Sequence, residues 1–144
     1  MIQFIVIVEG IIHTGDKILI GRKRLDIPHP LRGKWHFPGG KIKSEEDPYE
    51  AIVREIKEET NLSVKPVKIV DAYTYVQSYN LHNKIPQNIL HIVFECVPIG
   101  NSKIKPADDL IEVKWVRVRN VRKFITKYRT PERPKVKNLL THLI

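Results

Sequence analysis

Residues 40–62 read GKIKSEEDPYEAIVREIKEETNL, and this stretch predicts a tight turn, a short loop and one well-marked helix. Asp47 is a favourable helix N-cap, and Pro48 suits the first helical position because no backbone donor is needed there. Ile52 and Ile56 recur with the spacing of a single helix face, which predicts that this face packs against a core. We therefore expect the helix to begin directly after Asp47.

Three glutamates occupy a neighbouring face of the same helix. Glu55, Glu58 and Glu59 follow the spacing i, i+3 and i+4, so their carboxylates gather together and repel one another unless a cation neutralises them. A hard divalent ion with oxygen ligands, Mg²⁺ or Mn²⁺, suits such a site. Taken alone, an acidic helix face is more typical of a solvated surface, so the interpretation depends on the surrounding residues.

Those surrounding residues resemble the signature of the Nudix (MutT-like) hydrolases, G-x5-E-x7-R-E-U-x-E-E-x-G-U, in which U is a bulky aliphatic residue. The matching positions here are Gly40, Glu46, Arg54, Glu55, Ile56, Glu58, Glu59, Asn61 and Leu62. Only Asn61 departs, since the family has Gly there. That residue ends the helix in a left-handed conformation, which Asn tolerates better than most residues.

The resemblance implies an α/β fold, the Nudix α/β/α sandwich, in which the motif forms a loop, the catalytic helix and a second loop. It covers roughly residues 2–128, because the flanking segments GRKR, GKWHFPGG and DDLIEVKWV also look like the family. We expect a single domain over residues 1–144, with a last amphipathic helix at about 134–143.

Periodicity and turn residues predict the other elements. Strands are expected at 2–9, 17–22, 35–37, 66–77, 87–97 and 111–118, with a turn over 10–16 and loops over 23–33 and 100–109. Residues 2–9 are β-branched and alternate little, which predicts a strand buried on both faces. Asn120 is expected to cap a short helix that runs to Tyr128.

The resemblance also assigns roles to residues of the motif. It implies that the metal ion is held by Glu55, Glu58 and Glu59 together with the Gly40 carbonyl. Arg54 is expected to orient the carboxylates, and Glu46 either binds the metal through water or pairs with Arg54.

Family members place the general base differently, so several candidates stay open. They are Glu55, Glu58, Glu95, Asp108 and Asp109. His36 and His91 are equally compatible with packing on the sheet and with contacting a ligand.

Candidate substrate contacts are Arg24, Arg32, Trp35 and Tyr79. Trp35 is more typical of sheet packing than of a base-stacking platform. Tyr79 stands 17 residues after Leu62, where the dinucleoside polyphosphate branch of the family tends to carry a tyrosine. The proline typical of the ADP-ribose branch is missing at positions 77 and 78.

Composition and charge limit the classes of protein that fit. The 144 residues are 42% hydrophobic and 28% charged, as in an ordinary globular domain, and contain no apolar run that would span a membrane. The single Cys96 excludes an internal disulfide and suits a reducing cytoplasm. We expect a cytoplasmic monomer or homodimer.

The net charge of +9 is concentrated near the C-terminus, where residues 112–144 carry ten Lys or Arg against two Glu. A basic surface suits polyphosphate substrates and is also compatible with nucleic acid. The charges of Lys127, Arg129, Arg133, Lys135 and Lys137 alternate with Val136, Leu139 and Leu140. This pattern predicts that the charges face outward, away from the carboxylates.

The sequence as a whole favours a metal-dependent hydrolase that cleaves a phosphoanhydride bond in a nucleoside diphosphate linked to a group X. ILIGRKR at 18–24 and GKWHFPGG at 33–40 look like members that act on nucleoside triphosphates and nucleotide sugars. The alternatives are an RNA 5′-end pyrophosphohydrolase, a dinucleoside polyphosphate hydrolase and a catalytically silent nucleotide sensor. The intact glutamates argue against the sensor, and no aromatic–basic stacking module accompanies the basic tail.

Overall fold

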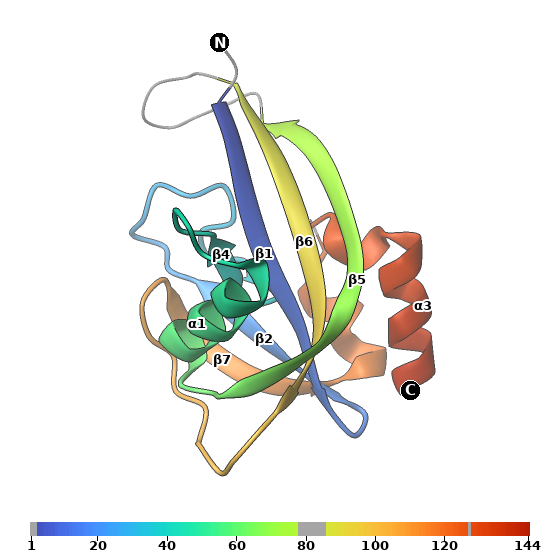
Figure 1. Ribbon diagram of the computed structural model, residues 1–144. Coiled ribbons are helices and arrows are strands. Elements are labelled where there is room, and N and C mark those ends of the chain that lie inside the picture. The colour runs from blue at the N-terminus through green and yellow to red at the C-terminus, as the bar shows by residue number, and fades with distance from the viewer. Residues whose placement is uncertain (1–2, 78–85, 127) are drawn as a thin grey trace.

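In the computed structural model, a mixed sheet with β1 (Gln3–Thr14) at its middle is covered by helices on both faces (Figure 1). The structure describes residues 3–77, 86–126 and 128–144. The other strands are β2 (Lys17–Lys23), β3 (Trp35–His36), β4 (Gly39–Lys41), β5 (Val64–Gln77), β6 (Gln87–Pro98) and β7 (Leu110–Arg117). The helices are α1 (Pro48–Thr60), α2 (Val121–Phe124) and α3 (Pro134–Leu143), with 3-10 turns η1 (Val118–Asn120) and η2 (Thr130–Glu132). The α/β class expected from the sequence is confirmed.

The sheet is organised around β1. This strand runs parallel to β6 and antiparallel to β4 and β2, while β6 pairs with β5, and β2 pairs with β3 and β7. Val8, Ile11 and Ile12 have no exposed surface. Within the range 2–9 that was expected to be buried on both faces, Val8 and Glu9 are buried but Phe4 is 59% exposed, so the expectation is confirmed only at the end of that range.

The turn expected over residues 10–16 is wrong for its first residues, because β1 continues to Thr14 and the chain turns at Gly15, whose φ is 57°. Gly10 is a strand residue instead. A side chain there would come within 2.9 Å of the Ile56 Cδ1 atom, so the glycine permits close packing of α1 on β1. A sequence pattern does not distinguish this use of glycine from a turn.

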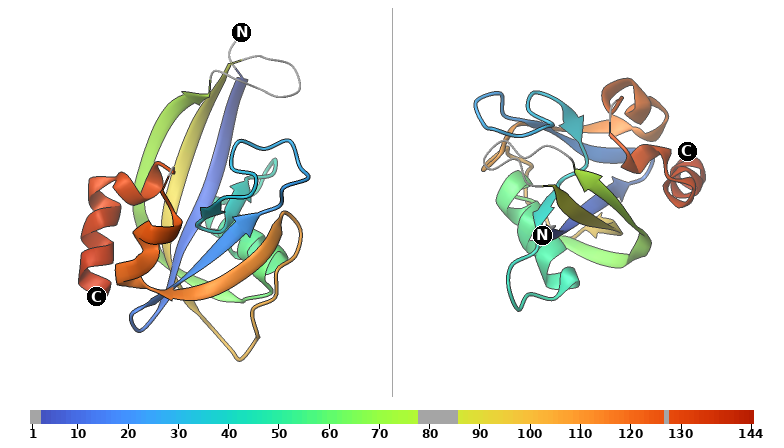
Figure 2. Two further views of the ribbon diagram at one scale, coloured as in Figure 1. Left: turned by 180° about the vertical axis from the view of Figure 1, so that it is seen from behind. Right: turned by 90° about the horizontal axis from the view of Figure 1, so that it is seen from above.

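Two hydrophobic clusters lie on opposite faces of the sheet. Ile52 and Ile56 of α1 pack with Val8 and Phe94 on one face. On the other face, residues of α2 and α3, including Val121 and Leu140, pack with the sheet. Figure 2 shows α1 and α3 on opposite sides of the strands. Within the described residues, no helix is long and apolar enough to cross a membrane.

The ends of α1 follow the local signals. The Asp47 side chain accepts a hydrogen bond from the Tyr49 amide at 2.8 Å, and Pro48 is the first helical residue. At the other end Asn61 adopts the left-handed conformation with a φ of 64°. The predicted cap and the predicted left-handed Asn61 are both confirmed.

The helix expected from Asn120 to Tyr128 is shorter in the structure. Asn120 makes no side-chain capping hydrogen bond, and α2 ends at Phe124 because Ile125 takes an extended conformation. The chain then crosses back toward the sheet before α3, whose bounds agree with the expected 134–143.

The left-handed Asn61 gives a test of this fold. Its side-chain amide also donates to the Lys103 carbonyl at 3.0 Å. Asn61→Val is expected to destabilise the protein by about 1–2 kcal/mol, since a β-branched residue resists positive φ. Asn61→Gly keeps the conformation and loses one exposed hydrogen bond, at a cost of about 1 kcal/mol or less. Urea unfolding of both variants measures the difference, and equal stabilities would contradict this account of the helix end.

Candidate active site

Two glutamates on the inner side of α1 lie against the strand β4. Glu55 and Glu59 are only 9% and 1% exposed. A side chain built on Gly40 would come within 2.5 Å of the Glu55 Oε2 atom, so the glycine is what lets this carboxylate approach the backbone. The Gly39 amide donates to the Glu59 Oε1 atom at 2.8 Å. The helix and the glycine turn therefore hold the two carboxylates at one place.

Arg54 orders the carboxylates on the outer side. It donates two hydrogen bonds to Glu46, at 2.6 and 2.9 Å, and one each to Glu55 at 2.9 Å and Glu58 at 3.1 Å. This guanidinium lowers the pKa of Glu46 to about 2. Two roles were left open for Glu46, and in the structure it is paired with Arg54.

The buried carboxylates have raised pKa values. Burial raises the pKa of Glu59 to about 8, although the Lys23 ammonium and the Gly39 amide act in the opposite direction. Burial likewise raises the pKa of Glu55, against the effect of Arg54. Carboxylates that ionise reluctantly in the protein alone are groups that a bound cation stabilises.

Carboxylate oxygens are suitable ligands for a hard divalent ion. The described part of the chain nevertheless contains no group of three acidic, His or Cys side chains close enough to enclose one. Within those same residues, no hydrogen-bond donor contacts the Oε2 atoms of Glu55 and Glu59. Glu58 is 43% exposed and remains paired with Arg54. Mg²⁺ and Mn²⁺ prefer oxygen ligands, and these Oε2 atoms have lone pairs available to bind such an ion.

A cavity of about 560 Å³ opens beside these carboxylates. Near the helix its lining carries both signs of charge, from Glu55, Asp108, Asp109, Lys23 and Lys41. Elsewhere it is lined by Tyr75, His91, Tyr128 and Arg129, with apolar surface from Leu31 and Phe37. A cavity of this volume accommodates a small organic ligand, and the mixture of cations and carboxylates suits phosphate groups.

The loop before β7 brings two more carboxylates to the cavity. Three hydrogen bonds fasten it to the end of α1: Asn61 Nδ2 to Lys103 O at 3.0 Å, Lys105 N to Thr60 O at 2.8 Å and Ala107 N to Glu59 O at 3.0 Å. Asp108 and Asp109 follow directly and both line the cavity. The structure thus brings these two candidates for the general base together with Glu55.

Glu95 lies elsewhere. Its carboxylate is 2.7 Å from the His13 Nε2 atom and 4.0 Å from the Lys68 ammonium, and it is not part of the cavity lining. The structure therefore does not bring this candidate base to the other carboxylates.

The arginines named as substrate contacts are also outside the cavity. Arg24 is paired with Asp26 through hydrogen bonds of 2.9 and 2.6 Å, and Arg32 is exposed. Tyr79 and Lys127 lie outside the described residues.

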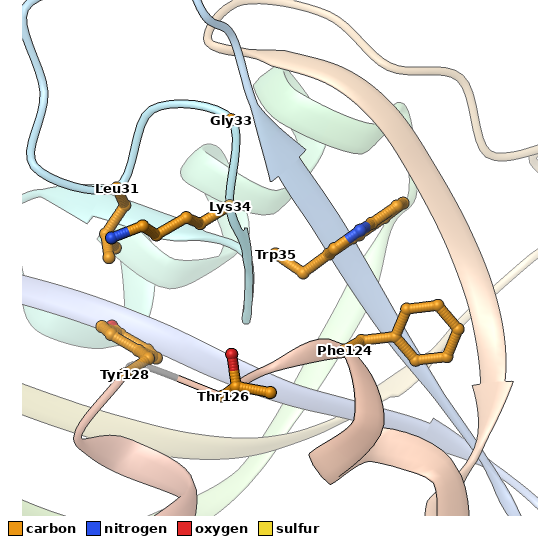
Figure 3. Close-up of a pocket in the computed structure, with 7 residues that line it drawn as sticks. All are labelled: Leu31, Gly33, Lys34, Trp35, Phe124, Thr126 and Tyr128. Atoms are coloured by element: carbon orange, nitrogen blue, oxygen red, sulfur yellow. The ribbon is translucent and has the colours of Figure 1, made fainter.

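Trp35 lines a separate, smaller cavity of about 230 Å³ (Figure 3). Its ring meets Phe124 edge to face at a centroid distance of 5.8 Å, and the Lys114 ammonium lies 4.7 Å from the Trp35 ring. Leu31 and Tyr128 line this cavity as well as the larger one, so together they form a shared wall. The structure gives Trp35 a packing role and no place in the larger cavity.

Sequence reasoning missed several residues of the larger cavity. Glu9 is the clearest, because it is the only charged residue among positions 1–12 and a carboxylate inside an apolar strand needs donors. His36 and His91, for which packing and ligand contact were both left open, are buried and line the cavity. Arg129 is exposed, as expected for the charges of this segment, but it also lines the cavity, which the expectation did not include.

Relatives are found over most of the chain. Residues 4–139 match the model of the NUDIX domain. An ADP-ribose pyrophosphatase of Methanocaldococcus jannaschii is 33% identical over 119 residues, which cover 82% of this chain and 64% of that protein. The chain thus spans less than two thirds of the length of this relative.

Solved structures share the fold. The MutT protein of Methanosarcina mazei Go1 has a TM-score of 0.72 at 21% identity, over 99% of this chain and 94% of that chain. A bifunctional NMN adenylyltransferase/ADP ribose pyrophosphatase of Francisella tularensis, complexed with AMP and a Mn ion, has a TM-score of 0.61 at 20% identity, over 99% of this chain and 42% of that chain. With its motif on α1 and a family match along nearly its whole length, the chain belongs to the Nudix hydrolases.

Proposed function

We propose that the chain hydrolyses a phosphoanhydride bond in a nucleoside diphosphate linked to a group X, with the help of a divalent cation. The observation that carries this proposal is the buried Glu55 carboxylate on the wall of a cavity that two lysines also line, with the buried Glu59 carboxylate behind it at the Gly39 amide. Lys23 is 5% exposed, and its ammonium is 3.8 Å from Asp109. A buried ammonium and the exposed Lys41, both beside carboxylates, match a substrate that carries several negative oxygens.

The cation would be held by Glu55, Glu58, Glu59 and the Gly40 carbonyl. When bound, a divalent cation neutralises phosphate oxygens and lowers the pKa of bound water, which is the chemistry this reaction requires. Mg²⁺ is the expected ion, and the Mn ion in the Francisella tularensis structure supports Mn²⁺ as a substitute.

The protein's own residues divide the remaining work. Lys23 and Lys41, which line the cavity, are the phosphate-binding residues of this proposal. Arg54 donates hydrogen bonds to Glu46, Glu55 and Glu58 and so orients all three carboxylates. Asp108 or Asp109 is the general base that we propose, and the supporting observation is that both line the cavity on a loop that is hydrogen-bonded to α1.

ADP-ribose is the first substrate to test, because the Methanocaldococcus jannaschii relative is an ADP-ribose pyrophosphatase. RNA is less favoured, since part of the basic C-terminal surface is neutralised within the protein. Arg122 and Lys137 both pair with Glu132, and Arg133 pairs with Asp71.

The first functional test is hydrolysis of ADP-ribose, nucleotide sugars and nucleoside triphosphates with Mg²⁺ or Mn²⁺. Glu55→Gln is expected to lower kcat by about 10²-fold, comparable to the removal of one preorganised electrostatic group. Glu50→Gln, on the exposed side of the same helix, is the matched control and should retain activity. EDTA should abolish turnover and leave the fold intact, whereas full activity in excess chelator would refute the metal-dependent mechanism.

A second test uses the raised pKa of Glu59 in metal-free protein. The folded protein keeps the Glu59 proton up to about pH 8, whereas the unfolded chain releases it near 4.5. Between these values the folded state binds more protons, so stability from this group falls as the pH rises. In EDTA, the wild-type Tm should decline from pH 5 to 8 more steeply than that of Glu59→Gln. Parallel Tm profiles for the two proteins would show that Glu59 is not the group responsible.

A further inference from the structure

Two arginines near the C-terminus lie over tyrosine rings of β5 in nearly the same way. The Arg129 guanidinium is 4.4 Å from the Tyr75 ring centroid, and the Arg133 guanidinium is 4.5 Å from that of Tyr73. Arg133 also donates to the Asp71 carboxylate at 2.8 Å. Arg129 has no carboxylate partner within the described residues, and it lines the larger cavity. Of the two, only Arg129 has a guanidinium free to meet a ligand.

A single buried carboxylate holds the chain on both sides of Arg129. Tyr128 and Thr130 each donate a hydrogen bond to Glu9, which is 1% exposed. His91 donates to the same carboxylate from Nδ1 at 2.8 Å. Because both neighbours are fastened to Glu9, the backbone at Arg129 is fixed relative to the sheet. Its side chain, which is exposed, lies over the Tyr75 ring.

The same network also fixes the aromatic ring beneath Arg129. The Tyr75 hydroxyl lies 3.1 Å from the His91 Nε2 atom, so His91 links Tyr75 to Glu9. Glu9 already accepts from three side chains, which leaves it no role as a partner of Arg129. The platform of Tyr75 and Arg129 is thus held in place before any ligand arrives.

This platform and the carboxylates lie at strands that are separated by two other strands of the sheet. Gly40 is on β4 and Tyr75 is on β5, with β1 and β6 between them. Three interstrand spacings amount to about 14 Å. A ligand with its phosphates at Glu55 would therefore present a different part of itself to Arg129.

A planar group is the ligand that this platform suits. A guanidinium stacked on a tyrosine leaves its opposite face and its N–H edge available, and these match the face and the acceptor atoms of a nucleobase. The neighbouring Leu31 and Phe37 add apolar surface to the cavity wall. Phosphates have cations nearer the carboxylates, in Lys23 and Lys41.

We propose that Arg129 is a specificity-determining residue that receives the nucleobase of the substrate on its Tyr75-backed guanidinium, and that Glu9 is the positioning residue that holds it there. This inference rests on the proposed function of the cavity. It predicts that binding distinguishes a nucleotide from the same sugar phosphate without a base.

The test compares ligands that differ only in the base. Binding of AMP, GMP, CMP, UMP and ribose 5-phosphate is measured by calorimetry for wild type and Arg129→Gln. We expect wild type to bind at least one nucleotide more tightly than ribose 5-phosphate, and Arg129→Gln to reduce that ratio by about 10-fold. With the hydrolysed substrate, KM should rise while kcat stays within a few-fold. A wild-type protein that binds all five ligands equally would overturn the proposal.

Two further variants separate stacking from charge. Arg129→Lys keeps the charge but loses the planar face, so it should not restore the ratio. If Arg129→Lys restored the ratio, the proposal would be overturned, because a charge without a planar face would then suffice and a contact to phosphate would explain the binding. Lys135→Gln removes one exposed charge outside the cavity and should leave the ratio unchanged. Hydrolysis that proceeds with no dependence on Arg129 would refute this inference alone, whereas no hydrolysis of any nucleotide would refute the proposed function.

The role of Glu9 has its own readout. Glu9→Gln should reduce the preference for the nucleotide over ribose 5-phosphate. Adding Arg129→Gln should reduce that preference little further, because both substitutions disrupt the same placement of the guanidinium over Tyr75. Tyr128→Phe removes one donor to Glu9 and gives the same comparison where Glu9→Gln does not fold. Additive losses in the double variant would show that Glu9 does not act through Arg129.

Discussion

The approach of the Glu55 carboxylate to the backbone of Gly40 determines where the rest of the site can lie. It requires a residue without a side chain at position 40 and a helix whose buried face carries charge as well as Ile52 and Ile56. Burial of the apolar residues provides the free energy that keeps the glutamates out of water. Arg54 then limits the repulsion among them, because it donates to several carboxylates at once.

The cavity beside this contact is lined by segments that are far apart in the chain. Two sets of hydrogen bonds bring these segments together. Hydrogen bonds to the end of α1 place the loop of Asp108 and Asp109. The buried Glu9 does the same for the segment around Arg129. Each set of hydrogen bonds satisfies buried polar groups that would otherwise destabilise the fold. The interactions that stabilise the structure therefore also shape the cavity.

The structural features that the sequence predicted correctly depend on residues that are close together in the chain. The cap at Asp47 and the left-handed Asn61 need only local stereochemistry, and both were confirmed. The family motif also located the carboxylates on one helix. By contrast, the position of the segment around Arg129 depends on hydrogen bonds to Glu9, about 120 residues earlier, and no local pattern encodes that pairing. Gly10 was misread because close packing and turning favour the same residue.

The unfavourable ionisation of Glu59 links stability to ligand binding. A buried carboxylate with a pKa near 8 weakens the metal-free fold at neutral pH, and replacing it by an uncharged residue would relieve that cost. Its retention beside Glu55 and Lys23 is understandable if a bound cation and phosphates complete the charge balance. The same reasoning applies to Arg129, whose guanidinium has a tyrosine beneath it but no carboxylate partner among the described residues. On the proposed function, the charges of Glu59 and Arg129 would therefore be balanced more fully once a cation and a substrate are bound than by the protein itself.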